Sequence, residues 1–61
     1  MPYVNIRVAG KLTRQQKSNI VKGVTEVIAN EANKPKNSIL IFIDEDNREN
    51  IASGGKLLDE K

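Results

Sequence analysis

The second residue of this chain is the one whose chemistry stands out. The sequence begins with Met1 and Pro2. An initiator methionine is usually removed when the next residue is small, and its removal here would leave proline at the amino terminus. A free amino-terminal proline is a secondary amine, and a pocket that lowers its pKa would let it act as a general base near neutral pH. If Met1 stays, the same nitrogen is an amide and has no basic lone pair.

The composition removes most other routes to catalysis. The chain has neither histidine nor cysteine, so Ser-His-Asp and Cys-His arrangements, disulfides and the common zinc ligand sets are excluded. Gly54 and Gly55 are not surrounded by the residues of a phosphate-binding loop, and such a pair is more typical of a flexible turn. We therefore expect no metal and no cofactor.

Two cations lie in predicted loops, and one of them, Arg48, could reach a neighbouring pocket. Lys11 follows the first predicted strand, and Arg48 lies in a predicted loop. Taken alone, each is more typical of a solvated surface side chain. The adjacent carboxylates Glu45 and Asp46 are interpreted in the same way, as solvated charges at a strand end. Arg7 is interpreted as a residue that covers the sheet or pairs across an interface.

The elements that would position these residues are two strands and one long helix. Residues 3–8 alternate between apolar and polar, which predicts a half-buried strand. Thr13 followed by Gln16 forms a capping-box pattern and predicts a helix over residues 14–33, which Pro35 would prevent from continuing. Residues 39–43 are all apolar and mostly β-branched, so they predict a strand covered on both faces.

One face of the predicted helix is apolar at the 3.6-residue period. That face consists of Ile20, Val21, Val24, Val27, Ile28 and Ala32. Gly23 interrupts the helix at a cost of about 1 kcal/mol relative to alanine. It is either simply tolerated or marks a close backbone approach at an interface. After the second strand we expect a polar turn over residues 44–50, a short extended piece over residues 51–55 and a tail over residues 56–61.

These elements predict a single α/β domain over residues 1–61, built as one βαβ unit with parallel strands. Such a chain buries only about 60% of the surface that its unfolded form exposes. Alternation also prevents Leu40 and Phe42 from lying on the same sheet face as Ile39 and Ile41. One apolar set must therefore be covered from outside the chain, so we expect a homo-oligomer whose sheet is completed by dimerisation.

Charge and hydropathy limit the other partners. The net charge is only +2, from ten basic and eight acidic side chains that are mixed along the sequence, so nucleic-acid binding is not expected. No apolar run approaches the roughly 20 residues that span a bilayer, and no signal peptide precedes the first strand, so we expect a cytoplasmic protein without membrane contact. A ribbon-helix-helix DNA-binding protein, with Asn5 and Arg7 in the major groove, is an alternative. It needs two helices after one strand, and the strand at residues 39–43 counts against it.

The order and spacing of several short motifs resemble the 4-oxalocrotonate tautomerase family over nearly the whole chain. They are Met1-Pro2-Tyr3-Val4-Asn5-Ile6, Gln16-Lys17 and Val21 to Val24 in the helix, Pro35, Ile43-Asp44-Glu45 and Ser53-Gly54-Gly55. The resemblance implies small βαβ subunits that pair into dimers with a four-stranded sheet, with three dimers forming a hexamer. It also implies an isomerase that moves a proton between keto and enol forms of a small enol acid such as 2-hydroxymuconate. The catalytic base would be Pro2.

The chain departs from the family where relatives hold the substrate. The positions of two carboxylate-binding arginines and one aromatic residue align with Leu12, Leu40 and Ile51. The resemblance therefore implies a site in which Leu40 and Ile51 contact substrate and in which Lys11 or Arg48 replaces the lost charge. Lysine lacks the bidentate fork of arginine, so a weaker grip on dicarboxylates is expected. A non-catalytic oligomer of the same fold, with an inherited proline, remains the alternative.

Overall fold

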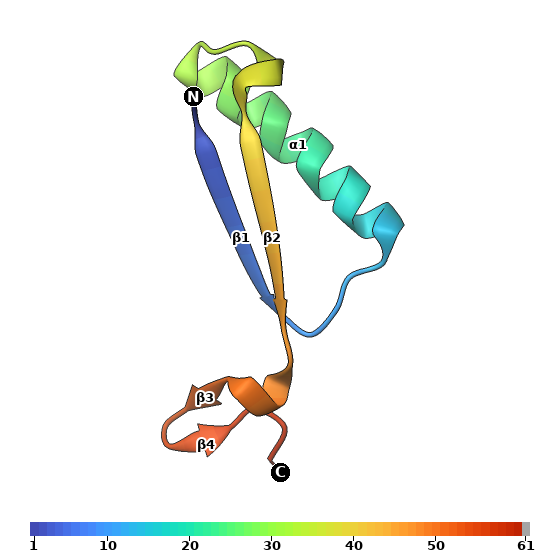
Figure 1. Cartoon of the computed structure of the whole chain (residues 1–61), viewed down its shortest axis with the longest axis vertical. Helices are drawn as coiled ribbons and strands as arrows, with labels where there is room; N and C mark the ends of the chain where they lie inside the picture. Colours follow the sequence, from blue (N-terminus) through green and yellow to red (C-terminus); the bar gives the residue numbers. More distant parts are fainter. Residues whose placement is uncertain (61) are drawn as a thin grey trace.

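Two parallel strands and one helix form the body of the molecule. The computed structural model describes residues 1–60. Strand β1 (Tyr3–Ala9) is followed by helix α1 (Arg14–Ala32), which leads through a short 3₁₀ turn to strand β2 (Leu40–Asp46). β1 and β2 pair in parallel with Tyr3 opposite Leu40, and α1 lies along one side of them (Figure 1). The predicted parallel βαβ unit is confirmed. The ribbon-helix-helix alternative is wrong, because a paired strand follows α1 where that fold needs a second helix.

Helix α1 begins and ends where local chemistry predicts. The Gln16 amide donates to the Thr13 hydroxyl at 3.1 Å, and the Thr13 amide donates to the Gln16 side chain at 2.9 Å, so the capping box is complete. At the other end Asn33 adopts the left-handed conformation with φ 55°, and its N–H donates to the Ala29 carbonyl. Helix geometry therefore stops at Ala32, one residue before the predicted end.

The second strand is longer than its apolar run. Residues 44–46 were expected in a polar turn, but they continue β2, with Asp44, Glu45 and Asp46 paired opposite Arg7, Val8 and Ala9. The ladder to β1 supplies the backbone hydrogen bonds, so these positions do not need apolar side chains to stay extended. The prediction placed the strand end at the loss of hydrophobicity, whereas it lies where β1 ends.

The C-terminal residues form a small arm beyond the sheet. After a 3₁₀ turn at Arg48–Asn50, strands β3 (Ala52–Ser53) and β4 (Lys56–Leu57) pair in antiparallel fashion. Gly54 and Gly55 join them with φ +61° and +85°, a conformation typical of a tight hairpin turn. The predicted extended piece is confirmed at residues 52–53, while the predicted tail is wrong at residues 56–57. Figure 1 shows this arm past the ends of β1 and β2, on the side opposite the amino terminus.

The core is thin. Ile39, with 9% of its surface exposed, is the buried hydrophobic residue among residues 1–60. The other side chains between sheet and helix are half-buried: Val4, Ile6, Val8, Ile41 and Ile43 from the strands, and Ile20, Val21, Val24 and Ile28 from α1. Val27 is 59% exposed and Ala32 is also exposed, so the predicted apolar helix face is too wide by these two residues.

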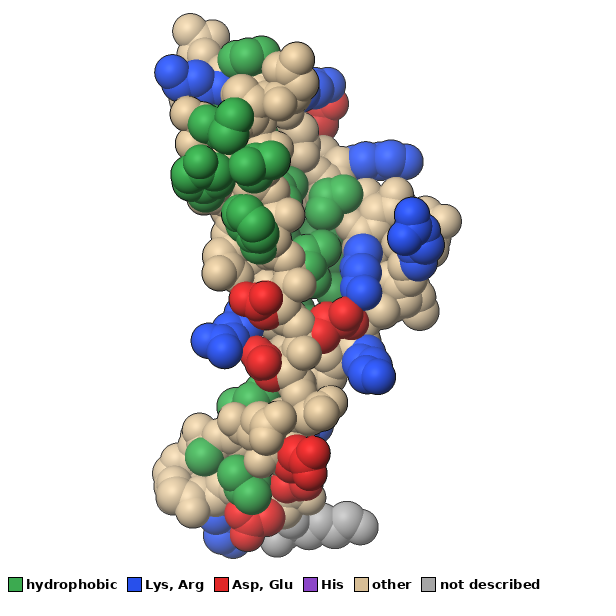
Figure 2. All heavy atoms as spheres, viewed as in Figure 1, with side chains coloured by type: hydrophobic (Ala, Val, Ile, Leu, Met, Phe, Trp, Pro, Cys, Tyr) green, Lys and Arg blue, Asp and Glu red, His purple; other side chains and the backbone are tan. Residues whose placement is uncertain are grey.

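The sheet face turned away from the helix is open. Tyr3 and Phe42 are 70% and 53% exposed, and their rings pack at a tilt with centroids 6.4 Å apart. Leu40 and Met1 are exposed beside them. In Figure 2 hydrophobic side chains gather over the upper part of the sheet, with acidic groups below them. The expected cover on both faces of β2 is therefore not provided by the chain itself.

The shape of the molecule also indicates that the subunit exposes more surface than a compact domain of its size. A folded monomer of 6.8 kDa has an accessible surface of about 4,000 Å², whereas this chain exposes 4926 Å². The radius of gyration is 14.7 Å, against about 10.5 Å for a compact domain of this length. Extents of 44 × 24 × 13 Å describe a flat, elongated subunit. This excess surface is what a chain that folds against partners would show.

Candidate active site

Pro2 lies at one end of the sheet, directly before β1. It is half-buried, and its carbonyl oxygen accepts a hydrogen bond from the Leu40 amide at 3.0 Å. Because a proline nitrogen has no N–H to contribute to a ladder, the first position of a strand suits it. The contact sets the start of β2 beside Pro2. The structure therefore brings Pro2 and Leu40 together.

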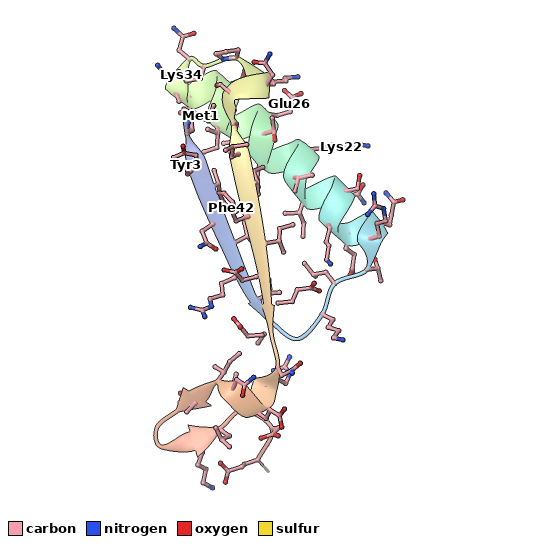
Figure 3. The ribbon with its side chains drawn as sticks, in the orientation of Figure 1. Met1, Tyr3, Lys22, Glu26, Lys34 and Phe42 are labelled. Atoms are coloured by element: carbon pink, nitrogen blue, oxygen red, sulfur yellow. The ribbon has the colours of Figure 1, made fainter. Side chains whose placement is uncertain are left out.

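A shallow apolar hollow lies on the open face, over the first residues of β1 and β2. It measures about 540 Å³ and is lined by Tyr3, Val4, Asn5, Leu40 and Phe42. Figure 3 shows the Tyr3 and Phe42 side chains on this part of the two strands, with Met1 at the adjacent chain end. Tyr3, Asn5 and Phe42 were not predicted as site residues. The sequence does contain a pattern that could have identified Tyr3 and Asn5, because strand alternation places both on the face that carries Leu40.

The other predicted site residues lie at the opposite end of the sheet. Lys11 follows β1 in an exposed loop, while Arg48 begins the 3₁₀ turn after β2 and Ile51 directly follows that turn. A Cβ atom placed on Gly10 would lie 4.0 Å from Nη2 of Arg48, so Arg48 reaches the residue next to Lys11. The two candidate cations thus share one end of the molecule. At about 3.3 Å per residue, the seven residues of β1 separate them from Pro2 by about 20 Å.

A second hollow at this end measures about 620 Å³. It is lined by Arg7, Val8, Ala9, Asp46, Asn50, Ile51 and Ala52. Nε of Arg7 lies 2.7 Å from Oδ2 of Asp46, so Arg7 pairs with the neighbouring strand of its own sheet. Asp46 raises the pKa of Arg7 through this hydrogen bond and its charge. The positive charge of Arg7 is therefore already paired with a carboxylate of its own subunit.

Glu45 is exposed, as predicted, but it also makes two contacts that the prediction did not include. Its Oε2 accepts a hydrogen bond from the Leu12 amide at 2.7 Å, and its Oε1 lies 2.7 Å from the ammonium of Lys17. These contacts lower the pKa of Glu45, with the Lys17 hydrogen bond as the largest cause and the Leu12 amide next. Lys17 was not predicted to have a role. Nothing local in the sequence pairs Glu45 with Leu12, which lies 33 positions earlier.

Within residues 1–60 no cluster of three acidic, histidine or cysteine side chains is suited to holding a metal ion. Over the same residues, no helix is both long enough and apolar enough to cross a membrane.

Known proteins share both the sequence pattern and this fold. A probable tautomerase from Bacillus cereus is 33% identical over 61 residues, covering 100% of both chains. A 2-hydroxymuconate tautomerase from Bacillus subtilis is 33% identical over 60 residues, covering 98% of this chain and 97% of the relative. The crystal structure of YwhB, a homologue of 4-oxalocrotonate tautomerase, superposes with a TM-score of 0.90 at 33% identity, covering 98% of this chain and 100% of that one.

The match extends along the chain. DmpI from Helicobacter pylori superposes with a TM-score of 0.83 at 32% identity, over 93% of this chain and 90% of that one. The family model described as "Tautomerase enzyme" matches residues 2–61, beginning at the proline. This span includes both strands, the helix and the C-terminal arm. The chain belongs to the tautomerase family.

Proposed function

We propose that this protein is an isomerase that interconverts the keto and enol forms of a small enol acid, with Pro2 as the catalytic base once Met1 has been removed. The observation that carries the proposal is the position of Pro2. It directly precedes β1, and its carbonyl accepts a hydrogen bond from Leu40, a residue that lines the apolar hollow on the open face. A family member without histidine or cysteine has few other groups that exchange protons near neutral pH.

In this proposal the reaction is a proton transfer between carbon atoms and oxygen. The neutral secondary amine of Pro2 takes a proton from the enol hydroxyl or from the carbon beside the carbonyl. The ammonium that forms returns a proton to another carbon, which gives a 1,3- or 1,5-transfer. An apolar neighbour such as Leu40, whose amide donates to the Pro2 carbonyl, would disfavour the charged amine and so favour its basic form.

The substrate-binding groups come from a second copy of the chain. Lys11, Arg48 and Ile51 lie about 20 Å from Pro2 in one subunit, because a strand of seven residues stands between them. Antiparallel pairing of two subunits would bring the Pro2 end of one against the Lys11 end of the other. Lys11 and Arg48 would then neutralise the substrate carboxylate and the developing enolate, while Leu40 and Ile51 would contact its apolar part.

The assembly that provides this pairing is a homo-oligomer, most simply a hexamer of three dimers. Three features support it: the open face with Tyr3 and Phe42, the excess accessible surface, and the division of the site between the two ends of the sheet. A solved 4-oxalocrotonate tautomerase from Chloroflexus aurantiacus is a heterohexamer, and it shares the fold with a TM-score of 0.89.

The substrate class follows from the two leucines. Relatives include a 2-hydroxymuconate tautomerase, whose substrate is a dicarboxylate. Here Leu12 and Leu40 occupy the positions at which the family places arginines, and Leu40 lines the apolar hollow. We therefore expect monocarboxylate enols such as phenylenolpyruvate to be better substrates than dicarboxylates.

The test is to compare processed protein with protein that retains Met1, both verified by intact mass, in ketonisation of phenylenolpyruvate. Processed protein should turn over, whereas the Met1-retaining form should be nearly inactive because its proline nitrogen is an amide. Pro2→Ala, once processed, keeps a primary amine and should retain part of the activity. Equal activity of the two forms would rule out proline chemistry. Inactivity of the processed form on both mono- and dicarboxylate enols would favour the non-catalytic alternative.

A further inference from the structure

The loop that carries Lys11 is tied to the end of β2 on both sides of that residue. Before it, the Gly10 amide donates to the Asp46 carbonyl at 2.8 Å. After it, the Leu12 amide donates to the Glu45 carboxylate at 2.7 Å. Gly10 has φ +97°, a conformation that other residues rarely adopt, so the turn at this point is built into the backbone. Lys11 is therefore held between two fixed neighbours while its own side chain stays exposed.

Glu45 does more than accept one hydrogen bond. Its second oxygen pairs with Lys17 in the first turns of α1, so one carboxylate joins β2, the loop and the helix. The pairing also affects Lys11 electrically. Nζ of Lys17 lies 2.7 Å from the Glu45 carboxylate. The positive charge of Lys17 offsets the attraction of Glu45 for the Lys11 ammonium, so Lys11 is only weakly neutralised. Within residues 1–60, Lys11 has no ion pair of its own.

We propose that Glu45 is a positioning residue for substrate binding, holding the loop of residues 10–13 so that the Lys11 ammonium is presented to a substrate carboxylate. This inference rests on the proposed function, in which Lys11 is a binding group. Glu45 itself does not touch the substrate. Its effect must therefore pass through Lys11, and that requirement separates a positioning role from a general contribution to stability.

The test is a double-mutant cycle in the oligomer. Glu45→Ala, Lys11→Ala and the double variant are compared with the processed wild type, using KM and kcat for phenylenolpyruvate and Kd for the unreactive monocarboxylate cinnamate. Glu45→Ala should raise KM and Kd about tenfold, because a misplaced binding group loses most of its contact. Any accompanying fall in kcat should also depend on Lys11, since Lys11 is proposed to neutralise the developing enolate. In the Lys11→Ala background the same substitution should change KM and Kd less than twofold.

A matched control comes from α1. Glu26 also pairs with a lysine, Lys36, but lies away from the loop. Glu26→Gln should leave KM, kcat and Kd unchanged. Glu45→Gln, which keeps an acceptor for the Leu12 amide, should fall between wild type and Glu45→Ala. Amide hydrogen exchange at Leu12 should speed up in Glu45→Ala and stay unchanged in Glu26→Gln.

The outcomes separate the two proposals. Equal effects of Glu45→Ala with and without Lys11, or a fall in kcat alone, would overturn the positioning role and leave the isomerase intact. If wild type binds cinnamate but turns over no enol acid, the proposed function falls, while the Kd cycle still decides the role of Glu45. If wild type neither binds nor turns over, both proposals are wrong.

Discussion

At the residue scale, the proposed base Pro2 contacts an apolar residue of the neighbouring strand. Pro2 is hydrogen-bonded through its carbonyl to Leu40, and Leu40 lines an apolar hollow on the open face together with Tyr3 and Phe42. Charged groups gather at the far end, where two ion pairs form: Arg7 with Asp46, and Lys17 with Glu45. In the proposed site, Pro2 could act as a base even if a dicarboxylate substrate is bound only weakly.

The first prediction concerns the binding of dicarboxylate substrates. Leu40→Arg, alone or with Leu12→Arg, should raise kcat/KM on 2-hydroxymuconate by roughly ten- to a hundredfold, because a hydrogen bond to a charged group contributes about 1.5–3 kcal/mol and each 1.36 kcal/mol is tenfold. The gain on phenylenolpyruvate should be much smaller. Steady-state kinetics measure kcat/KM on both substrates for each variant and the wild type. A wild type that already prefers the dicarboxylate strongly would show that another group, with Arg48 the first to test, supplies the charge.

The second prediction concerns pH. The pKa of Glu45 is lowered from its usual 4.5 by Lys17, the Leu12 amide and, more weakly, Lys11. Between the lowered value and 4.5 the folded carboxylate binds fewer protons than the unfolded one. Its stabilising contribution is therefore fully present above about pH 4.5 and is lost as pH falls through the folded pKa.

This can be measured by urea unfolding from pH 3 to 7. Glu45→Gln should be less stable than wild type by a constant amount above about pH 4.5, and the gap should close at lower pH. The effect should be small, since the ion pair is partly exposed. Glu49→Gln, a carboxylate in the 3₁₀ turn at Arg48–Asn50, is the control and should show no such gap. A gap that stays constant down to pH 3 would contradict the assignment.

At the element scale, α1 is well capped but poorly buried. Its N-terminus has a complete capping box and its C-terminus a left-handed Asn33, while none of its residues is fully buried within the chain. Gly23 lies mid-helix, where a Cβ would meet no atom within 4 Å. The close approach considered from the sequence therefore does not occur inside the subunit.

The third prediction follows from that open space. Gly23→Ala should stabilise the protein by about 1 kcal/mol, because glycine costs that much relative to alanine in a helix interior. Thermal or urea unfolding at fixed protein concentration measures it, with kcat as a check that the site is unchanged. Destabilisation would mean that another subunit packs against the backbone at this point, which is the interface explanation of the glycine.

At the scale of the whole molecule, the subunit is flat and one of its faces lacks a cover. The exposed surface of 4926 Å² and the radius of gyration of 14.7 Å both exceed the values for a compact domain of this size. Met1, Tyr3, Leu40 and Phe42 form an apolar area on the face away from α1. A chain with one buried core residue in the described range needs this surface to be covered in order to be stable.

The fourth prediction is that assembly depends on this face. Phe42→Asp should weaken subunit association by about 2 kcal/mol or more, since truncated or charged aromatic anchors dominate interface losses. Gel filtration with light scattering should show smaller species at micromolar concentration, with a lower and more concentration-dependent melting temperature. Asn30→Asp adds the same charge to an exposed position of α1 and should leave the assembly unchanged. A folded 6.8 kDa wild-type monomer would contradict the prediction.

Local patterns in the sequence determined much of the architecture. Alternation over residues 3–8, the Thr13–Gln16 capping box and the apolar run at residues 39–43 predict the parallel βαβ unit, because each signal acts within a few residues. The excess of apolar side chains over two sheet faces likewise predicts a surface in need of cover. Pro2 would become a secondary amine on removal of Met1, so the sequence alone identifies it as a candidate base.

Tertiary structure decided what depends on residues far apart in the chain. Residues 44–46 stay in β2 because β1 pairs with them across 37 positions, and hydrophobicity carries no such information. Glu45 reaches Leu12 across 33 positions, and Asp46 reaches Arg7 across 39. The separation of Pro2 from Lys11 follows from the full length of β1, which places them at opposite ends of the sheet. Side-chain types set what each residue can do, but pairing between distant segments set which residues can act together.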